Sequence, residues 1–119
     1  MADLPAEALR ARLAGALREA MKSRDTVVVA TLRTLLSALD NAGAVPETRD
    51  HAPVFGRSGD APRRELTAGD ARRVLSAEAD EREAAAADYE RRGLQESAQR
   101  LRTELEIIQR FMGAAAGGD

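Results

Sequence analysis

One pair of charged residues in this sequence has the spacing of a specific contact. Glu78 and Arg82 lie four residues apart, on or beside the apolar face of a segment with helical periodicity, and the order acid before base favours an ion pair across one helical turn. Such a pair either locks two helices together or contacts a partner, and a solvated pair at the edge of a helix is the competing interpretation. On an exposed surface the pair adds only about 0.3–0.5 kcal/mol, so stability alone is a weak reason for it.

The residue types that usually carry catalysis are scattered or absent. The sequence has no cysteine and one histidine, His51, which excludes disulfides, thiolate metal sites and a cysteine nucleophile. His51 falls in a segment rich in proline and glycine, where a catalytic base has neither a rigid setting nor a partner. The carboxylates that follow Glu78 are spread around a helix and are expected to form a solvated face. The sequence therefore predicts no catalytic residues, no cofactor and no metal site.

Basic side chains form two candidate sites for phosphate, because guanidinium geometry matches phosphate oxygens. The first site consists of Arg10, Arg18, Lys22 and Arg24, and the second of Arg91 and Arg92. The formal net charge of -2 argues against a surface that attracts nucleic acid as a whole. No aromatic residue lies among these cations to stack on bases. Nucleic-acid binding by this chain would therefore have to be local.

Two shorter helices are predicted over about residues 5–22 and 25–42. An acidic cap at Asp3 and Pro5 in the first turn favour the start of the first helix, and Asp25 is the predicted cap of the second. In the first helix, apolar residues recur every fourth position and predict a buried stripe. They are Leu9, Leu13, Leu17 and Met21.

Two longer helices are predicted over about residues 67–92 and 94–112. Thr67 with Asp70 three residues later resembles a capping box, and Gly93 can adopt the positive φ that the turn between the helices requires. The fourth helix has apolar residues at alternating steps of four and three, which is typical of a helix-packing seam. They are Leu94, Ala98, Leu101, Leu105, Ile108 and Met112.

These elements predict one all-α domain over residues 3–112, a four-helix bundle made of two antiparallel helical hairpins, the second long and coiled-coil-like. Prolines and glycines in residues 43–66 predict a linker, in which the apolar pair Val54-Phe55 either contacts the bundle or belongs to a mobile loop. Residues 113–119 are expected to be a flexible tail. No apolar run approaches the roughly 20 residues that span a bilayer, and no signal peptide is visible, so a cytoplasmic protein is expected.

The order of these features resembles the GatB/YqeY family, small bacterial proteins similar to the helical C-terminal region of the tRNA-dependent amidotransferase B subunit. The resemblance is carried by Met21-Lys22 followed by Asp25, Leu32-Arg33 before Ser37-Ala38, Val74-Leu75 before Glu78 and Arg82, and Tyr89 ahead of Gly93. In the amidotransferase B subunit the helical and tail region holds tRNA, and other domains carry the chemistry. The resemblance therefore implies tRNA binding rather than catalysis for a chain of this kind. The family label of carbon-nitrogen ligase activity with glutamine as amido-N-donor has no catalytic set in this sequence to support it.

Two features depart from the family pattern. Phe111-Met112 is followed by Gly113 and a low-complexity end, so the usual C-terminal tail module is expected to be absent. Asp80 and Glu81 stand where many relatives have basic or amide residues, and their charge would repel phosphate.

The resemblance implies a non-catalytic helical module that binds tRNA or a translation-associated protein. The alternative is a protein-protein interaction or self-association module without nucleic-acid binding, in which an exposed part of the fourth helix packs on a partner helix. We expect a monomer or a weak homodimer. An enzyme would require an activity that works without a conventional catalytic set.

Overall fold

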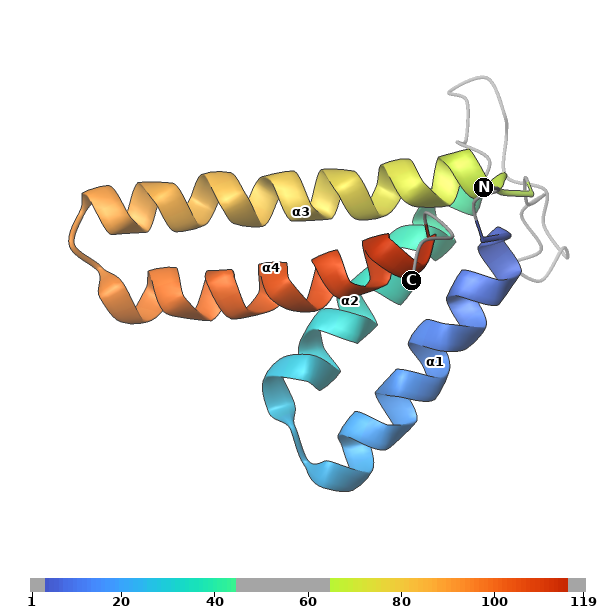
Figure 1. Ribbon diagram of the computed structural model, residues 1–119, viewed down its shortest axis with the longest axis horizontal. Coiled ribbons are helices and arrows are strands. Elements are labelled where there is room, and N and C mark those ends of the chain that lie inside the picture. The colour runs from blue at the N-terminus through green and yellow to red at the C-terminus, as the bar shows by residue number, and fades with distance from the viewer. Residues whose placement is uncertain (1–3, 45–64, 116–119) are drawn as a thin grey trace, which may run out of the picture.

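All regular elements in the described part of the chain are helices. The computed structural model describes residues 4–44 and 65–115, and Figure 1 shows how the helices are arranged. They are α1 (Ala6–Ser23), α2 (Thr26–Gly43), α3 (Ala68–Arg91) and α4 (Gln95–Ala115). The prediction of an all-α chain with four helices is confirmed for these residues. Within the same ranges, none of the helices combines the length and the apolar character needed to cross a membrane.

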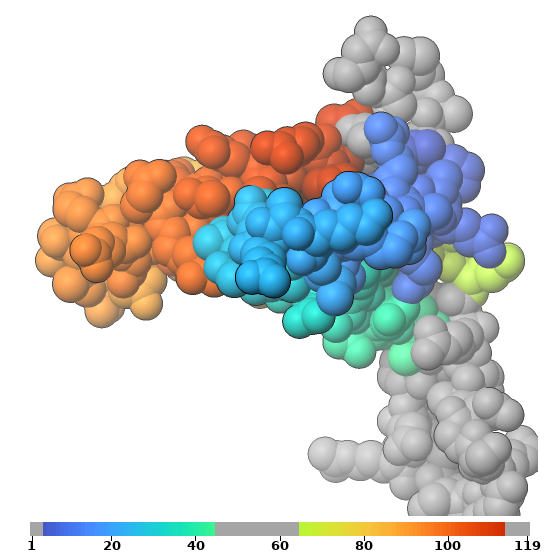
Figure 2. Space-filling model, turned by 90° about the horizontal axis from the view of Figure 1, so that it is seen from below, coloured from blue at the N-terminus to red at the C-terminus, as the bar shows by residue number. Residues whose placement is uncertain are grey.

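The helices are paired as two hairpins of unequal length. α1 turns back into α2, and the longer α3 turns back into α4 (Figure 1). The α1–α2 pair meets the α3–α4 pair at an angle and covers only one end of it. In the space-filling view of Figure 2, the rest of the α3–α4 pair projects beyond α1 and α2.

The apolar core lies where the two hairpins meet. Its largest fully buried apolar side chains come from all four helices: Leu9, Leu13, Leu32, Leu35, Leu39, Leu75 and Ile108. The contribution of α3 comes from its N-terminal half and that of α4 from its C-terminal half. Between Arg82 and Glu104 the hairpin buries only two apolar side chains, Ala86 and Ala98. We call residues 82–104 the α3–α4 arm.

Two predicted helix caps are confirmed by hydrogen bonds. The side chain of Asp25 accepts the backbone N–H of Val28 at 3.3 Å at the start of α2. Before α3, the Thr67 hydroxyl accepts the N–H of Asp70 at 3.0 Å, and the Asp70 carboxylate accepts the N–H of Thr67 at 3.1 Å. These bonds from Thr67, with a further one from Arg73, lower the pKa of the Asp70 carboxyl. Each cap satisfies donors that a helix N-terminus leaves free.

Two helix ends differ from the prediction. Pro5 precedes α1 instead of lying in its first turn, and its carbonyl accepts the N–H of Leu9 at 3.0 Å. Helix α4 continues through Gly113 to Ala115 and does not end at Met112. A glycine inside a helix costs only about 1 kcal/mol relative to alanine, and the alanines that follow favour the helical state. The predicted tail therefore begins too early.

Both apolar stripes are uncovered at one end, so the prediction that the whole stripe of α1 is buried is wrong. On α1, Leu9 and Leu13 are fully buried and Leu17 is half-buried, but Met21 is 51% exposed. On the α4 seam, Leu94 is 48% exposed. Both residues lie near the turn of their hairpin, beyond the region where the two hairpins cover each other.

Three sequence features cannot be placed. Asp3, His51 and the pair Val54-Phe55 lie outside the described residues, as do residues 45–64 of the predicted linker.

Candidate functional site

The Glu78–Arg82 ion pair is formed, and it extends to a second helix. Arg82 Nη1 lies 2.6 Å from Glu78 Oε1, and Arg82 Nε lies 3.3 Å from Glu104 Oε1 on α4. Arg100 reaches the other oxygen of Glu104, with its Nε at 3.0 Å. The Arg82 side chain is 12% exposed, so the surrounding helices shield these charges from most of the solvent. We call these four residues, Glu78, Arg82, Arg100 and Glu104, the Arg82 cluster. It links α3 to α4 where the core ends and the arm begins, as the helix-locking interpretation of the pair expects.

A second charged cluster links the two helices of the arm. Arg102 on α4 lies 2.5 Å from Glu83 and 2.8 Å from Glu90, both on α3. The hydrogen bond from the Arg102 guanidinium lowers the pKa of the Glu90 carboxyl, and the same bond raises the pKa of Arg102. Charges therefore support a part of the hairpin where the buried side chains are alanines.

Two cations of the first candidate phosphate site are already paired. Arg10 forms an ion pair with Asp40 of α2, and Lys22 Nζ lies 3.7 Å from Glu19 on its own helix. Arg10 lies near the start of α1, whereas Lys22 lies near its end at the turn into α2. The structure therefore does not bring the predicted stripe together as one phosphate-binding surface.

Both cations of the second candidate site are also paired within the chain. Arg91 and Arg92 share one carboxylate, Asp88, at 3.3 and 3.2 Å. Among the six cations that the sequence proposes, only Arg18 and Arg24 form no ion pair with a described residue.

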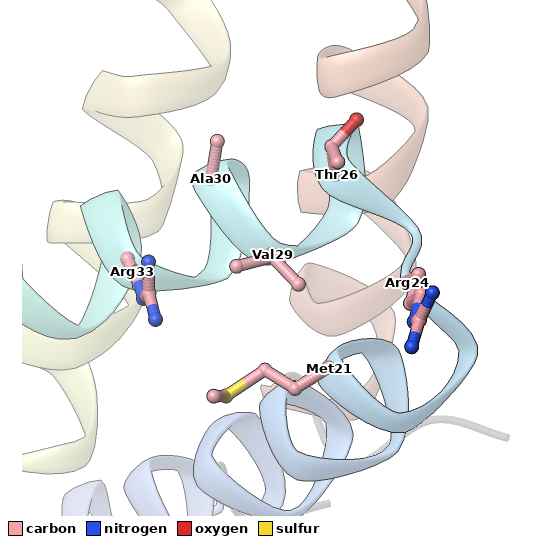
Figure 3. A pocket seen from close by; sticks show the side chains of 6 residues that line it. All are labelled: Met21, Arg24, Thr26, Val29, Ala30 and Arg33. Atoms are coloured by element: carbon pink, nitrogen blue, oxygen red, sulfur yellow. The ribbon is translucent and has the colours of Figure 1, made fainter.

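Arg24 borders a surface groove at the α1–α2 turn. The groove has a volume of about 530 Å³ and is lined by Met21, Arg24, Thr26, Val29, Ala30 and Arg33. We call it the α1–α2 groove. The four residues from α2 have the spacing of a single helix face, and the opposite face of α2 carries its core leucines. Figure 3 shows Met21 and Val29 near the middle of the groove, with Arg33 and Arg24 on either side.

The charge of the α1–α2 groove is entirely positive. Arg33, like Arg24, forms no ion pair with any residue in the described ranges, and no carboxylate belongs to the lining. The neighbouring Asp25 caps α2 through the N–H of Val28. The groove therefore combines thioether and methyl groups with two guanidinium groups that have no carboxylate partner in the described part of the chain.

Arg24 also has an unusual backbone conformation. Its φ of 58° and ψ of 36° are left-handed, which costs a residue other than glycine about 1–2 kcal/mol. The turn is closed by the N–H of Arg24, which donates to Met21 O at 3.3 Å, and by the N–H of Asp25, which donates to Ala20 O at 3.0 Å. This bonding pattern usually has glycine at the left-handed position. Local strain of this kind clusters at functional sites.

A comparable hollow on the α3–α4 arm has a different chemistry. It has a volume of about 480 Å³ and is lined by Ala85, Tyr89, Glu96, Ser97, Arg100 and Leu101. Its lining carries both signs of charge, and its arginine is already bound to Glu104. The arm hollow therefore offers no cation that lacks a partner.

The lining of the α1–α2 groove combines apolar, cationic and hydroxyl groups. Its side chains provide apolar contact, two cations and one hydroxyl, that of Thr26. Across the described residues, no group of three or more His, Asp or Glu side chains is arranged to hold a metal ion.

Comparison with known proteins identifies the family. A search among curated proteins finds no match. The family model described as Yqey-like protein matches residues 10–117, a range that includes the groove, the Arg82 cluster and the arm. Because this match covers most of the sequence, the chain belongs to the YqeY-like protein family.

Proposed function

We propose that this chain is a non-catalytic helical module that binds another protein through the α1–α2 groove. The observation that carries the proposal is the exposed Met21, which lies with Val29 between two arginines that have no carboxylate partner among the described residues. Methionine adapts its shape to different partners, and arginine and methionine are enriched at protein interfaces. The lining holds no general base, so the proposal includes no carbon-nitrogen ligase step.

The folded chain supports a binding role for Met21 better than a packing role. Leu9 and Leu13 on the same face of α1 are completely buried, whereas Met21 remains half in solvent. Covering apolar surface contributes about 25 cal/mol per Å², and the chain itself leaves that contribution unused at Met21. A partner that covers Met21 and Val29 gains this contribution to the free energy of binding.

Site-specific photo-crosslinking tests the proposal. A photoreactive residue in place of the exposed Ala30 in the groove is compared with the same residue at the exposed Ala84 on the arm. We expect a discrete protein adduct, identified by mass spectrometry, from position 30 and not from position 84. Adding Met21→Asp should abolish the adduct while circular dichroism shows unchanged helix content. Equal labelling at both positions, or no adduct, contradicts the proposal.

A role linked to tRNA is the second candidate, because Arg24 and Arg33 have no anionic partner in the described chain. The resemblance to the tRNA-holding region of the amidotransferase supports this role. A filter-binding titration with bulk tRNA at about 50 and 200 mM salt tests it, because phosphate contacts weaken steeply as salt rises. Substituting both arginines with glutamine should then weaken binding, whereas Arg91→Gln with Arg92→Gln should not. Undetectable or salt-insensitive binding rejects the role.

Self-association is tested separately by size-exclusion chromatography with light scattering. A monomer at high protein concentration rejects a homodimer and leaves binding to a different protein in place.

A further inference from the structure

We infer that the partner segment in the α1–α2 groove is an acidic amphipathic helix. One apolar side chain of the segment sits on Met21 and Val29, and two carboxylates on the same helix face pair with Arg24 and Arg33. This inference rests on the proposed protein-binding function and adds the chemistry of the partner.

The apolar part of the groove requires an apolar anchor on the partner. The Met21 side chain runs from the end of α1 along the groove beside Val29 of α2 (Figure 3), and Ala30 belongs to the same lining. A polar anchor would lose its hydration at this surface and find only the Thr26 hydroxyl as a hydrogen-bonding side chain outside the arginines. A leucine, methionine or phenylalanine side chain avoids this loss.

The charges of the groove select an acidic partner. Docking a basic or neutral helix would cover Arg24 and Arg33 without giving them an anion, which disfavours such partners. A carboxylate accepts two parallel hydrogen bonds from one guanidinium, so each arginine can fix one glutamate or aspartate. Electrostatic complementarity therefore determines which helices bind and in which orientation.

The positions of the arginines determine the spacing of the acidic residues. Arg24 and Arg33 lie on either side of the apolar centre (Figure 3), so the partner's carboxylates must flank its anchor. Residues three or four positions before and after an apolar residue share its helix face, and helices commonly dock in grooves through such spacing. A nucleic acid supplies anions, but the lining has no aromatic side chain on which a base could stack. The apolar centre thus favours a protein helix over RNA.

Fluorescence polarisation with the full chain and three designed peptides tests the inference. The first is an alanine-rich helical peptide with Glu, Leu and Glu at successive fourth positions, the second replaces both Glu with Lys, and the third replaces Leu with Ser. We expect the first to bind at least about ten-fold more tightly than either of the others, because close charge pairs and a central apolar anchor dominate such interfaces.

Variants of the chain locate the binding site of the first peptide. Arg24→Gln and Arg33→Gln should each weaken binding about five- to ten-fold, and Met21→Asp should abolish it. Arg91→Gln is the matched control, because it removes another exposed arginine that is already paired with Asp88, and it should leave affinity unchanged. Circular dichroism verifies that every variant retains its helix content.

Each contrary result has a distinct meaning. Equal binding of the first and third peptides shows attraction by charge alone and overturns the inference. Salt-sensitive tRNA binding that depends on Arg24 and Arg33, without peptide binding, assigns the groove to nucleic acid and also overturns it. An adduct from position 30 without peptide binding rejects the acidic helix but retains the protein-binding function. Failure of both the crosslinking and the peptides rejects both.

Discussion

The two hairpin turns solve the same geometric problem with different residues. Gly93 between α3 and α4 has a φ of 74°, and Arg24 between α1 and α2 has a φ of 58°. At Gly93 the conformation is nearly free of cost, and the adjacent Arg91 and Arg92 both pair with the carboxylate of Asp88. At Arg24 the conformation is strained, and the guanidinium has no ion-pair partner among the described residues. This difference is expected if Arg24 binds a partner, as we propose, and if the second turn only has to reverse the chain.

The surfaces next to the two turns also differ in how far their charges are paired. The α3–α4 arm is closed by internal ion pairs, and its surface hollow contains both charges. The end of the α1–α2 hairpin has an apolar centre with cations only. The charges of the arm are therefore paired within the chain, whereas Arg24 and Arg33 have no ion-pair partner among the described residues.

The largest expected change in stability comes from the buried end of α1, and the end of α1 at the groove serves as its comparison. Leu13→Ala empties a fully buried position and should lower the free energy of unfolding by about 2–5 kcal/mol. Met21→Ala, two turns later on the same face, should change it by less than about 0.5 kcal/mol because surface substitutions have small effects. Urea denaturation followed by circular dichroism measures both. Similar losses at the two positions would show that Met21 is buried in solution.

The next effect concerns the charge cluster at the base of the arm. Arg82→Met leaves Glu78 and Glu104 facing each other without their shared cation and should lower the free energy of unfolding by about 1–3 kcal/mol. Arg91→Met at the exposed turn is the control and should have almost no effect. If the two variants are equally stable, the arm does not depend on the Arg82 cluster.

Replacing the glycine of the second turn tests whether its conformation matters. Gly93→Ala should lower the free energy of unfolding by about 1–2 kcal/mol, and only through the backbone, because an added Cβ meets nothing within 4 Å. Gly113→Ala, the same change in a helical position, should instead raise stability by up to about 1 kcal/mol. Thermal denaturation of both variants measures these changes in stability. A change of the same sign in both variants would refute a special role for the positive φ at Gly93.

The smallest effect is the reverse substitution in the first turn. Arg24→Gly should raise the free energy of unfolding by about 0.5–1 kcal/mol by relieving the left-handed strain, while it weakens binding of the acidic peptide. Arg24→Lys keeps both the strain and a positive charge and should not gain stability. A glycine variant no more stable than the lysine variant would mean that the turn is unstrained.

Local signals made most of the helices predictable. The caps at Asp25 and Thr67 and the apolar periodicities depend on residues within a few positions of one another, and the helices that they predict are present in the structure. The ion pair Glu78–Arg82 was predictable for the same reason. Its third member, Glu104, is 22 positions from Arg82 and becomes visible only when the register of α4 against α3 is known. The proximity of Glu104 to Leu105 on the apolar seam was the one available signal.

The α1–α2 groove could not be predicted from periodicity. Met21 continues the leucine row of α1, and the sequence does not reveal where that row passes beyond the second hairpin. Nor does an arginine at a helix end signal a left-handed residue, because glycine and asparagine are the usual choices. The position of the groove therefore follows from how the hairpins cross.

The uncovered arm also has a dynamic consequence. Its helices bury only alanines beyond the core, and their amides can exchange with solvent through local opening of the hairpin, without loss of the leucine core. The amides near Leu35, in contrast, become accessible only when the whole domain unfolds. This single domain should therefore display two levels of hydrogen-exchange protection along one pair of helices, with the boundary at the Arg82 cluster.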